Sequence, residues 1–197
     1  MTEIPIYVLA GGRSSRFGRD KALAPLHGRP LLQVAVEPFA GRPGPLTVVA
    51  DVPDKYKDLG LRTLGDLEPD RGPLGGLLTA LADRARGGAE GWLLLTACDF
   101  VGTRPAWIDL LAEARRPGAR AVAFRGERWE PLFALYHTAL REEAAAELEA
   151  GRVALWRLLD RVHAIPVGLP ADWSAARSLD TPRAVAEHEK SWQEEPR

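Results

Sequence analysis

The sequence predicts a single α/β domain in which a mainly parallel, twisted sheet carries helices on both faces in a Rossmann-like arrangement. Short apolar runs of strand character alternate along the chain with segments of helical apolar spacing, and the connections between them are short. The 197 residues, 46% of them hydrophobic, suffice for one buried core without disulfides. We expect this domain to span residues 1–190 and a frayed tail to occupy residues 191–197.

The first half of the chain opens with the clearest strand. Ile4 to Ala10 (IPIYVLA) is apolar, rich in β-branched residues and followed by two glycines, which indicates a buried strand entering a loop. Pro30 to Phe39 shows helical spacing, Leu46 to Ala50 (LTVVA) a second buried strand, and Arg62 to Leu64 a short third one.

The next helix and strand bring a carboxylate to the sheet. Pro73 suits a first helical position before LGGLLTALADRA, whose leucines share one face. Trp92 to Thr96 (WLLLT) is almost continuously apolar, as expected of a central strand covered on both sides, and Ala97, Cys98 and Asp99 follow it. Asp99 is therefore expected at the carboxyl end of a strand.

The second half continues the alternation to a final helix that Thr181 caps. The expected elements are a helix at Ala106–Ala114, strands at Ala121–Phe124 and Leu132–Tyr136, helices within Leu140–Leu159, a strand at Ala164–Val167 and a helix from Pro182.

Composition excludes several classes of protein. The net charge of −1, without a basic block, argues against nucleic-acid partners, and the chain lacks an apolar run long enough to span a membrane. The single cysteine, Cys98, excludes an internal disulfide and a multi-cysteine zinc site. We expect a cytoplasmic monomer.

The segment from Gly11 to Lys21 (GGRSSRFGRDK) carries more glycine and positive charge than a strand-to-helix turn requires. Gly11 and Gly12 let backbone amides approach phosphate oxygens, while Arg13, Arg16 and Lys21 add charge-assisted contacts. The loop has neither the GK[ST] ending of a P-loop nor the GxGxxG spacing of a dinucleotide turn. It is interpreted as a triphosphate cradle; the alternative is a solvated surface loop.

Transfer of a group from a bound triphosphate would account for the charges at this edge of the sheet. Arg16 and Lys21 would neutralise a pyrophosphate leaving group, with Gly12 and Gly18 letting the loop fold over it. Asp99 would hold Mg²⁺, which usually takes only one or two protein carboxylates. The alternatives are a helix-capping role for Asp99 and a solvated surface position for Arg16.

A second turn is a candidate for contacting the nucleoside. Guanine presents adjacent N–H donors, which Asp66 and backbone carbonyls between Gly72 and Gly76 could accept. The alternative is an ordinary turn, PDRGP, that starts a helix.

The segment LAGGRSSRFGRDKAL resembles the signature of nucleotidyltransferases that activate sugars and cofactors. Together with EPDRGPLGGL, CDF and EPLFALY, it resembles the molybdenum cofactor guanylyltransferases over Ile4 to about Pro182. The resemblance implies transfer of GMP from GTP to the terminal phosphate of molybdopterin, with release of pyrophosphate. It also implies pterin contacts at Arg152 and Asp180, an Mg²⁺ ligand at Asp99, and nucleotide contacts at Leu9, Ala10, Gly11, Lys21, Asp66 and Asp99.

Two other functions stay open on the sequence. One is the same chemistry on other substrates, such as cytidylyl transfer to molybdopterin or nucleotidyl transfer to a sugar phosphate. The other is a protein that binds a nucleotide or cofactor without catalysis. Further partners implied by the resemblance are cofactor-biosynthesis proteins and acceptor molybdoenzymes.

Overall fold

A computed structural model describes residues 3–11, 17–18, 20–88 and 90–194 of the chain. In this part of the chain a seven-stranded sheet has the order β10-β8-β9-β6-β1-β4-β5, and two small two-stranded sheets pair β2 with β3 and β7 with β11. The strands are β1 (Ile6–Leu9), β2 (Pro25–Leu26), β3 (Arg29–Pro30), β4 (Leu46–Ala50), β5 (Thr63–Gly65), β6 (Trp92–Ala97), β7 (Phe100–Val101), β8 (Ala121–Arg125), β9 (Trp129–His137), β10 (Ile165–Val167) and β11 (Arg177–Ser178).

The large sheet is mainly parallel, as the sequence predicted. Strands β6, β1, β4 and β5 run in one direction beside each other, and β10 is parallel to β8. Strand β9 is the exception, because it pairs antiparallel with both β6 and β8. Antiparallel neighbours can be joined by a tight hairpin, and residues 126–128 make that connection between β8 and β9.

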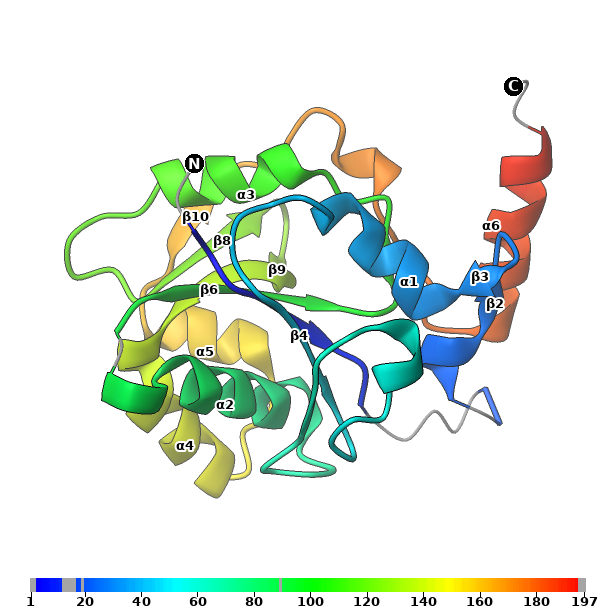
Figure 1. Ribbon diagram of the computed structural model, residues 1–197. Coiled ribbons are helices and arrows are strands. Elements are labelled where there is room, and N and C mark those ends of the chain that lie inside the picture. Colours follow the sequence, from blue (N-terminus) through cyan, green and yellow to red (C-terminus); the bar gives the residue numbers. More distant parts are fainter. Residues whose placement is uncertain (1–2, 12–16, 19, 89, 195–197) are drawn as a thin grey trace.

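Helices cover both faces of the sheet (Figure 1). Helices α1 and α3 lie on one face, and α2, α4 and α5 lie on the other, while α6 stands at one end of the molecule. Their bounds are α1 (Leu31–Val36), α2 (Gly72–Arg84), α3 (Pro105–Glu113), α4 (Arg141–Glu149), α5 (Leu155–Arg161) and α6 (Pro182–Glu194).

Strand alternation explains the two cores. Ile6 and Val8 of β1 point to the face covered by α1 and α3, whereas Tyr7 points to the face covered by α2, α4 and α5. Strand β6 divides in the same way, with Leu94 in one core and Leu93 and Leu95 in the other. Both sides of these central strands are buried, which is why their sequences read as continuous apolar runs.

Several element boundaries differ from the prediction by a few residues. Strand β5 begins at Thr63 instead of Arg62, and β9 begins at Trp129, three residues before Leu132. Helix α6 extends to Glu194, past the predicted boundary at residue 190. The division of the chain into a domain and a tail at residue 190 otherwise stays a prediction.

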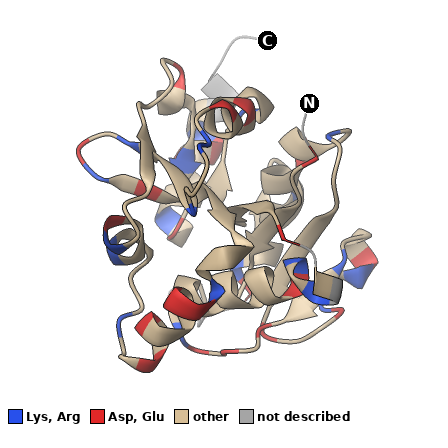
Figure 2. Ribbon diagram, turned by 90° about the vertical axis from the view of Figure 1, so that its left-hand side faces the viewer, with Lys and Arg blue, Asp and Glu red and all other residues tan. Residues whose placement is uncertain are grey.

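Charged residues of both signs are scattered along the ribbon in Figure 2. Among the helices of the described residues, none combines the length and apolar character that crossing a membrane requires.

Candidate active site

The carboxyl ends of four neighbouring strands meet at one edge of the sheet, where they form a cleft. Backbone hydrogen bonds hold this edge together: Ala10 N donates to Val49 O (2.8 Å), Cys98 N to Leu9 O (2.9 Å), and Asp66 N to Ala50 O (2.7 Å). The cleft has a volume of about 260 Å³, and its lining includes Leu9, Gly11, Lys21, Asp66, Asp70, Gly72, Gly76, Asp99 and Leu132. Open α/β sheets bind ligands at this edge.

Lys21 and Asp99 meet in this cleft. The Lys21 Nζ donates to Asp99 Oδ2, and the two side chains are only 19% and 16% exposed. They come from positions 78 residues apart, at the end of the glycine-rich segment and after β6. The Phe17 ring lies 5.7 Å from the same ammonium group. A cation and a carboxylate therefore share one partly sheltered site next to Gly11.

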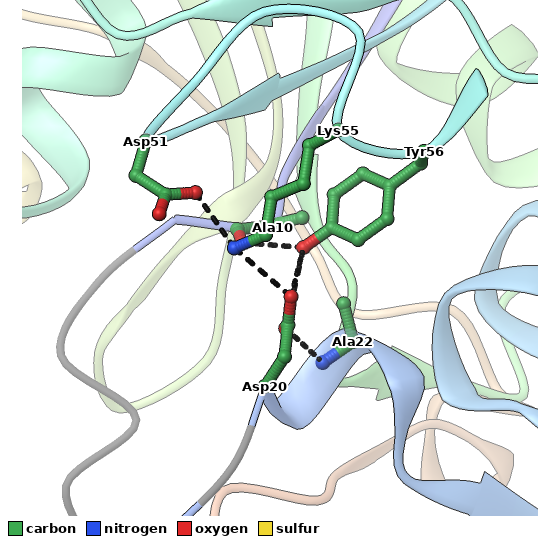
Figure 3. A network of polar contacts seen from close by, with 6 residues as sticks. All are labelled: Ala10, Asp20, Ala22, Asp51, Lys55 and Tyr56. Carbon is green, nitrogen blue, oxygen red and sulfur yellow. Dashed lines mark hydrogen bonds and ion pairs between the residues drawn. The ribbon is translucent and has the colours of Figure 1, made fainter.

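A partly buried network centred on Asp20 fixes the end of the glycine-rich segment (Figure 3). Asp20 Oδ1 accepts a hydrogen bond from Ala22 N (3.0 Å) and so caps the short 3₁₀ turn η1 (Lys21–Leu23). The Tyr56 hydroxyl lies 3.0 Å from Asp20 Oδ2 and 3.2 Å from Ala10 O. Lys55 Nζ bridges Asp20 (2.9 Å) and Asp51 (2.7 Å). This network places Lys21 relative to the end of β1.

The hydroxyl of Tyr56 is a fixed donor in this network. Its side chain is buried, and burial together with the nearby Asp20 carboxylate raises the pKa of Tyr56, so the phenol keeps its proton at neutral pH. The neutral Tyr56 hydroxyl therefore connects the Asp20 carboxylate with the backbone carbonyl of Ala10, the residue that follows β1.

Asp66 is held by α2. Its Oδ1 accepts from the Thr79 hydroxyl (2.7 Å) and from Glu68 N (3.0 Å), and Leu67 N donates to the same hydroxyl (2.9 Å). Because these donors use Oδ1, the second carboxylate oxygen is left for a ligand in the cleft, whose lining includes Asp66.

Two glycines bring the start of α2 close to β1. A Cβ on Gly76 would lie 2.6 Å from Leu9 Cδ2, so only glycine leaves this leucine in place. Gly72, with a φ of +66°, turns the chain into the helix in a conformation that disfavours side chains. These contacts explain why Leu9, Gly72 and Gly76 line the same cleft.

The remaining predicted site residues are not in the lining of the cleft or lie outside the described residues. Gly18 is described, at a φ of +62°, whereas Gly12, Arg13 and Arg16 fall in the segment 12–16 that the structure does not describe. Ala10 is buried under the cleft.

The two residues predicted to bind the pterin occupy different surroundings. The backbone N of Leu179 donates to the carbonyl O of Asp99 (2.8 Å), a residue of the cleft lining, and Asp180 is the next residue in the chain. Arg152 lies between α4 and α5, where its guanidinium donates two bonds, of 2.7 and 2.8 Å, to the buried carboxylate of Glu147. The structure thus gives Arg152 a structural ion pair and does not place it in the lining of the cleft.

Sequence reasoning missed the Asp20 network and Thr79. Asp20 carried a usable signal, because an aspartate directly before an apolar run is a favoured N-cap. Tyr56 and Lys55 carried none, since they lie more than 30 residues from Asp20 and contact it only after folding. Cys98, to which no role was assigned, is buried, and burial raises its pKa to about 12.

We expect Tyr56→Phe to lower the free energy of unfolding by about 1 kcal/mol, which corresponds to a fall in Tm of about 2–4 °C. It should also raise the Kd for nucleotide, because Asp20 loses a donor beside Lys21. The matched control is Tyr7→Phe, whose hydroxyl donates to Asp83 (2.9 Å) in a pocket with Arg62, Arg84 and Arg86. Denaturation and nucleotide titration should show a similar stability loss in both variants and weaker nucleotide binding only in Tyr56→Phe. Equal nucleotide affinities would contradict the positioning role.

The glycine-rich segment follows β1 at the carboxyl edge of a mainly parallel sheet, and a cation and a carboxylate meet beside it, an arrangement typical of α/β domains that bind nucleotides. Residues 6–165 match the model of the MobA-like NTP transferase domain. The chain therefore belongs to the MobA-like NTP transferase family.

Similar proteins agree with this assignment. A probable molybdenum cofactor guanylyltransferase from Deinococcus radiodurans is 42% identical over 154 residues, covering 77% of this chain and 76% of that protein. The molybdenum cofactor guanylyltransferase of Yersinia pestis (strain Pestoides F) is 31% identical over 178 residues, or 89% of each chain.

Solved structures share the fold. Molybdopterin-guanine dinucleotide biosynthesis protein A from Archaeoglobus fulgidus superposes with a TM-score of 0.80 at 19% identity, covering 98% of this chain and 100% of that one. The nucleoside-diphosphate-sugar pyrophosphorylase from Vibrio cholerae has a TM-score of 0.63 at 14% identity, covering 95% and 100%. The predicted single-domain α/β fold is confirmed.

Proposed function

We propose that this protein transfers GMP from GTP to the terminal phosphate of molybdopterin and releases pyrophosphate. The observation that carries the proposal is the meeting of Lys21 and Asp99 over the carboxyl edge of the sheet, in a chain of the MobA-like family. Its relatives from Deinococcus and Yersinia bear the name of this activity.

The triphosphate would occupy the space beside Gly11, where backbone amides and the Lys21 ammonium can approach its oxygens. Lys21 would exchange its contact with Asp99 for the phosphates. The leaving pyrophosphate gains negative charge as its bond to the α-phosphorus breaks, and a fixed ammonium stabilises that charge. Arg16 is proposed to contribute to the same neutralisation.

The donors of the cleft fit Mg²⁺. Asp99 offers a carboxylate oxygen, and Mg²⁺ in nucleotide sites is usually held by one or two carboxylates together with substrate phosphates. Within the described ranges, no cluster of three or more His, Cys, Asp or Glu side chains is arranged to hold a metal ion. Bound there, the ion would neutralise phosphate charge and orient the α-phosphorus for in-line attack.

The acceptor needs no protein base. A phosphate monoester, with a second pKa of about 6, is largely dianionic at neutral pH and can attack directly. The task of the protein is then to hold the two phosphates in line and exclude water. Asp66, whose Oδ1 is fixed by Thr79, is proposed to accept from the nucleoside with its other oxygen.

The test is a pyrophosphate-release assay with Mg²⁺ and molybdopterin, run in parallel with GTP, CTP, UTP and ATP, with the dinucleotide product identified by mass. We expect turnover with GTP, loss of turnover with a chelator and recovery with added Mg²⁺. In a thermal-shift panel, GTP at 100 times its Kd should add about 2.7 kcal/mol.

Each alternative gives a different result. Protection by CTP or UTP and not by GTP would refute the guanylyl assignment, and transfer to a sugar phosphate instead of molybdopterin would refute the acceptor. GTP binding without any transfer would indicate a non-catalytic protein. The cytoplasmic location and the monomeric state stay predictions.

A further inference from the structure

A second cavity lies on the same edge of the sheet as the nucleotide cleft. It has a volume of about 440 Å³ and is formed where the hairpin between β8 and β9 faces α5. We call it the tryptophan recess and define it by its seven lining residues: Arg125, Glu127, Arg128, Trp129, Pro131, Trp156 and Asp160. Pro131 in the recess is adjacent in β9 to Leu132, which lines the nucleotide cleft. The two cavities are therefore neighbours along one strand.

One wall of the recess is rigid. Trp129 is 8% exposed, its Nε1 donates to Asp160 Oδ1 (2.7 Å), and the Arg125 guanidinium lies 4.6 Å from its ring centre. Arg125 and Trp129 are also paired across the β8–β9 ladder. The hairpin is tight, since Gly126 N donates to Arg128 O (3.1 Å). These contacts keep the wall in place before any ligand arrives.

The opposite wall presents an aromatic surface to solvent. Trp156, in the first turn of α5, is 48% exposed, and the Arg157 guanidinium lies 5.1 Å from its ring centre. An indole left half in water at the mouth of a cavity is a surface on which a flat heteroaromatic ring can stack.

The recess offers both a hydrogen-bond donor and a hydrogen-bond acceptor. Arg128 and Glu127, both at the tip of the hairpin, line the cavity, and no ion pair within the described ranges uses either side chain. A guanidinium donates only, and a carboxylate accepts only. The pair therefore suits a ring that carries acceptors on one edge and donors on another.

We propose that the tryptophan recess binds the pterin ring of the acceptor while its phosphate arm reaches into the nucleotide cleft. This inference rests on the proposed function, which supplies an acceptor with a pterin at one end and the reacting phosphate at the other. A pterin has an amino group and an adjacent ring N–H for Glu127, and a carbonyl and ring nitrogens for Arg128. From Trp129 to Leu132 the strand covers about 10 Å, a span that separates the ring from the reacting phosphate.

This site differs from the one predicted from the sequence. Arg152 lies in the turn that leads into α5, three residues before Leu155, and its guanidinium donates to the carboxylate of Glu147. The ion pair of Arg152 with Glu147 would hold the turn before α5 in place, while Trp156, Glu127 and Arg128 contact the ring.

The test is an anaerobic calorimetric titration of molybdopterin into the full chain in the presence of GTP and a chelator that prevents turnover. We expect Trp156→Ala and Arg128→Ala each to raise the Kd for molybdopterin about tenfold. Trp156→Phe should retain affinity to within roughly threefold, because a phenyl ring still stacks. The Kd for GTP should be unchanged in all three variants. A pterin lacking the phosphate arm should compete with molybdopterin and not with GTP.

The matched controls are Leu110→Ala in α3 and Arg116→Ala just after that helix, which remove an exposed apolar and an exposed cationic side chain. Wild-type molybdopterin affinity in Trp156→Ala and Arg128→Ala would overturn the recess, and so would a parallel rise in their Kd for GTP. Neither outcome would contradict the proposed transfer of GMP. A wild-type protein that binds molybdopterin but transfers no GMP would instead refute the proposed function, and the variants would still test the recess. A wild-type protein that does not bind molybdopterin would overturn both the proposed function and the recess.

Discussion

Asp99→Asn is expected to lower kcat for GMP transfer on the order of 10²–10³-fold. The amide keeps the size of the side chain but removes the negative charge that would hold Mg²⁺ against the phosphates. Because Asp99 is partly exposed and its main contact is with Lys21, the fold should survive. The measurement is pyrophosphate release at saturating GTP and molybdopterin, with the Mg²⁺ concentration varied.

The dependence on Mg²⁺ separates a metal role from a structural one. If Asp99 holds the ion, the Mg²⁺ concentration for half-maximal activity should rise in Asp99→Asn along with the loss of turnover. The control is Asp109→Asn in α3, which also removes a carboxylate from an ion pair, in this case with Arg42 (2.7 Å). Wild-type turnover in Asp99→Asn, or a melted far-UV spectrum, would refute the prediction.

Much of the fold could be predicted because the central strands are covered on both faces. Runs such as WLLLT in β6 are apolar at every position, and that pattern is readable without tertiary context. The direction of β9 was not stated, although only residues 126–128 separate it from β8. A connection that short forces an antiparallel pair, so the signal was present in the spacing once the start of β9 at Trp129 is known.

The candidate site, too, could be predicted from the sequence only in part. Lys21 and Asp99 each follow a recognisable strand, and the carboxyl ends of parallel strands share one edge, so their meeting could be predicted. Tyr56 could not, because its contact with Asp20 depends on how the loop after β4 folds back. The same limit applies to the recess, where Trp129 and Trp156 come from separate elements.

Lys21→Met is expected to lower kcat/KM for GTP on the order of 10²–10³-fold. Methionine keeps the length of the side chain, and the Asp20 cap and the Tyr56 hydrogen bonds stay available to hold the backbone at this position. The loss then reports the ammonium charge that neutralises the pyrophosphate. Lys57→Met, an exposed lysine in the 3₁₀ turn η3 (Lys57–Leu59), is the control and should keep wild-type kinetics.

The double variant Lys21→Met/Asp99→Asn tests whether the two side chains act on one ligand. If both serve a single metal–triphosphate unit, the second substitution should cost far less than it does alone, because the first has already misplaced the phosphates. The product of the two single losses, measured as kcat/KM, would show instead that the side chains act independently. Only coupled losses agree with a triphosphate held between Lys21 and Asp99.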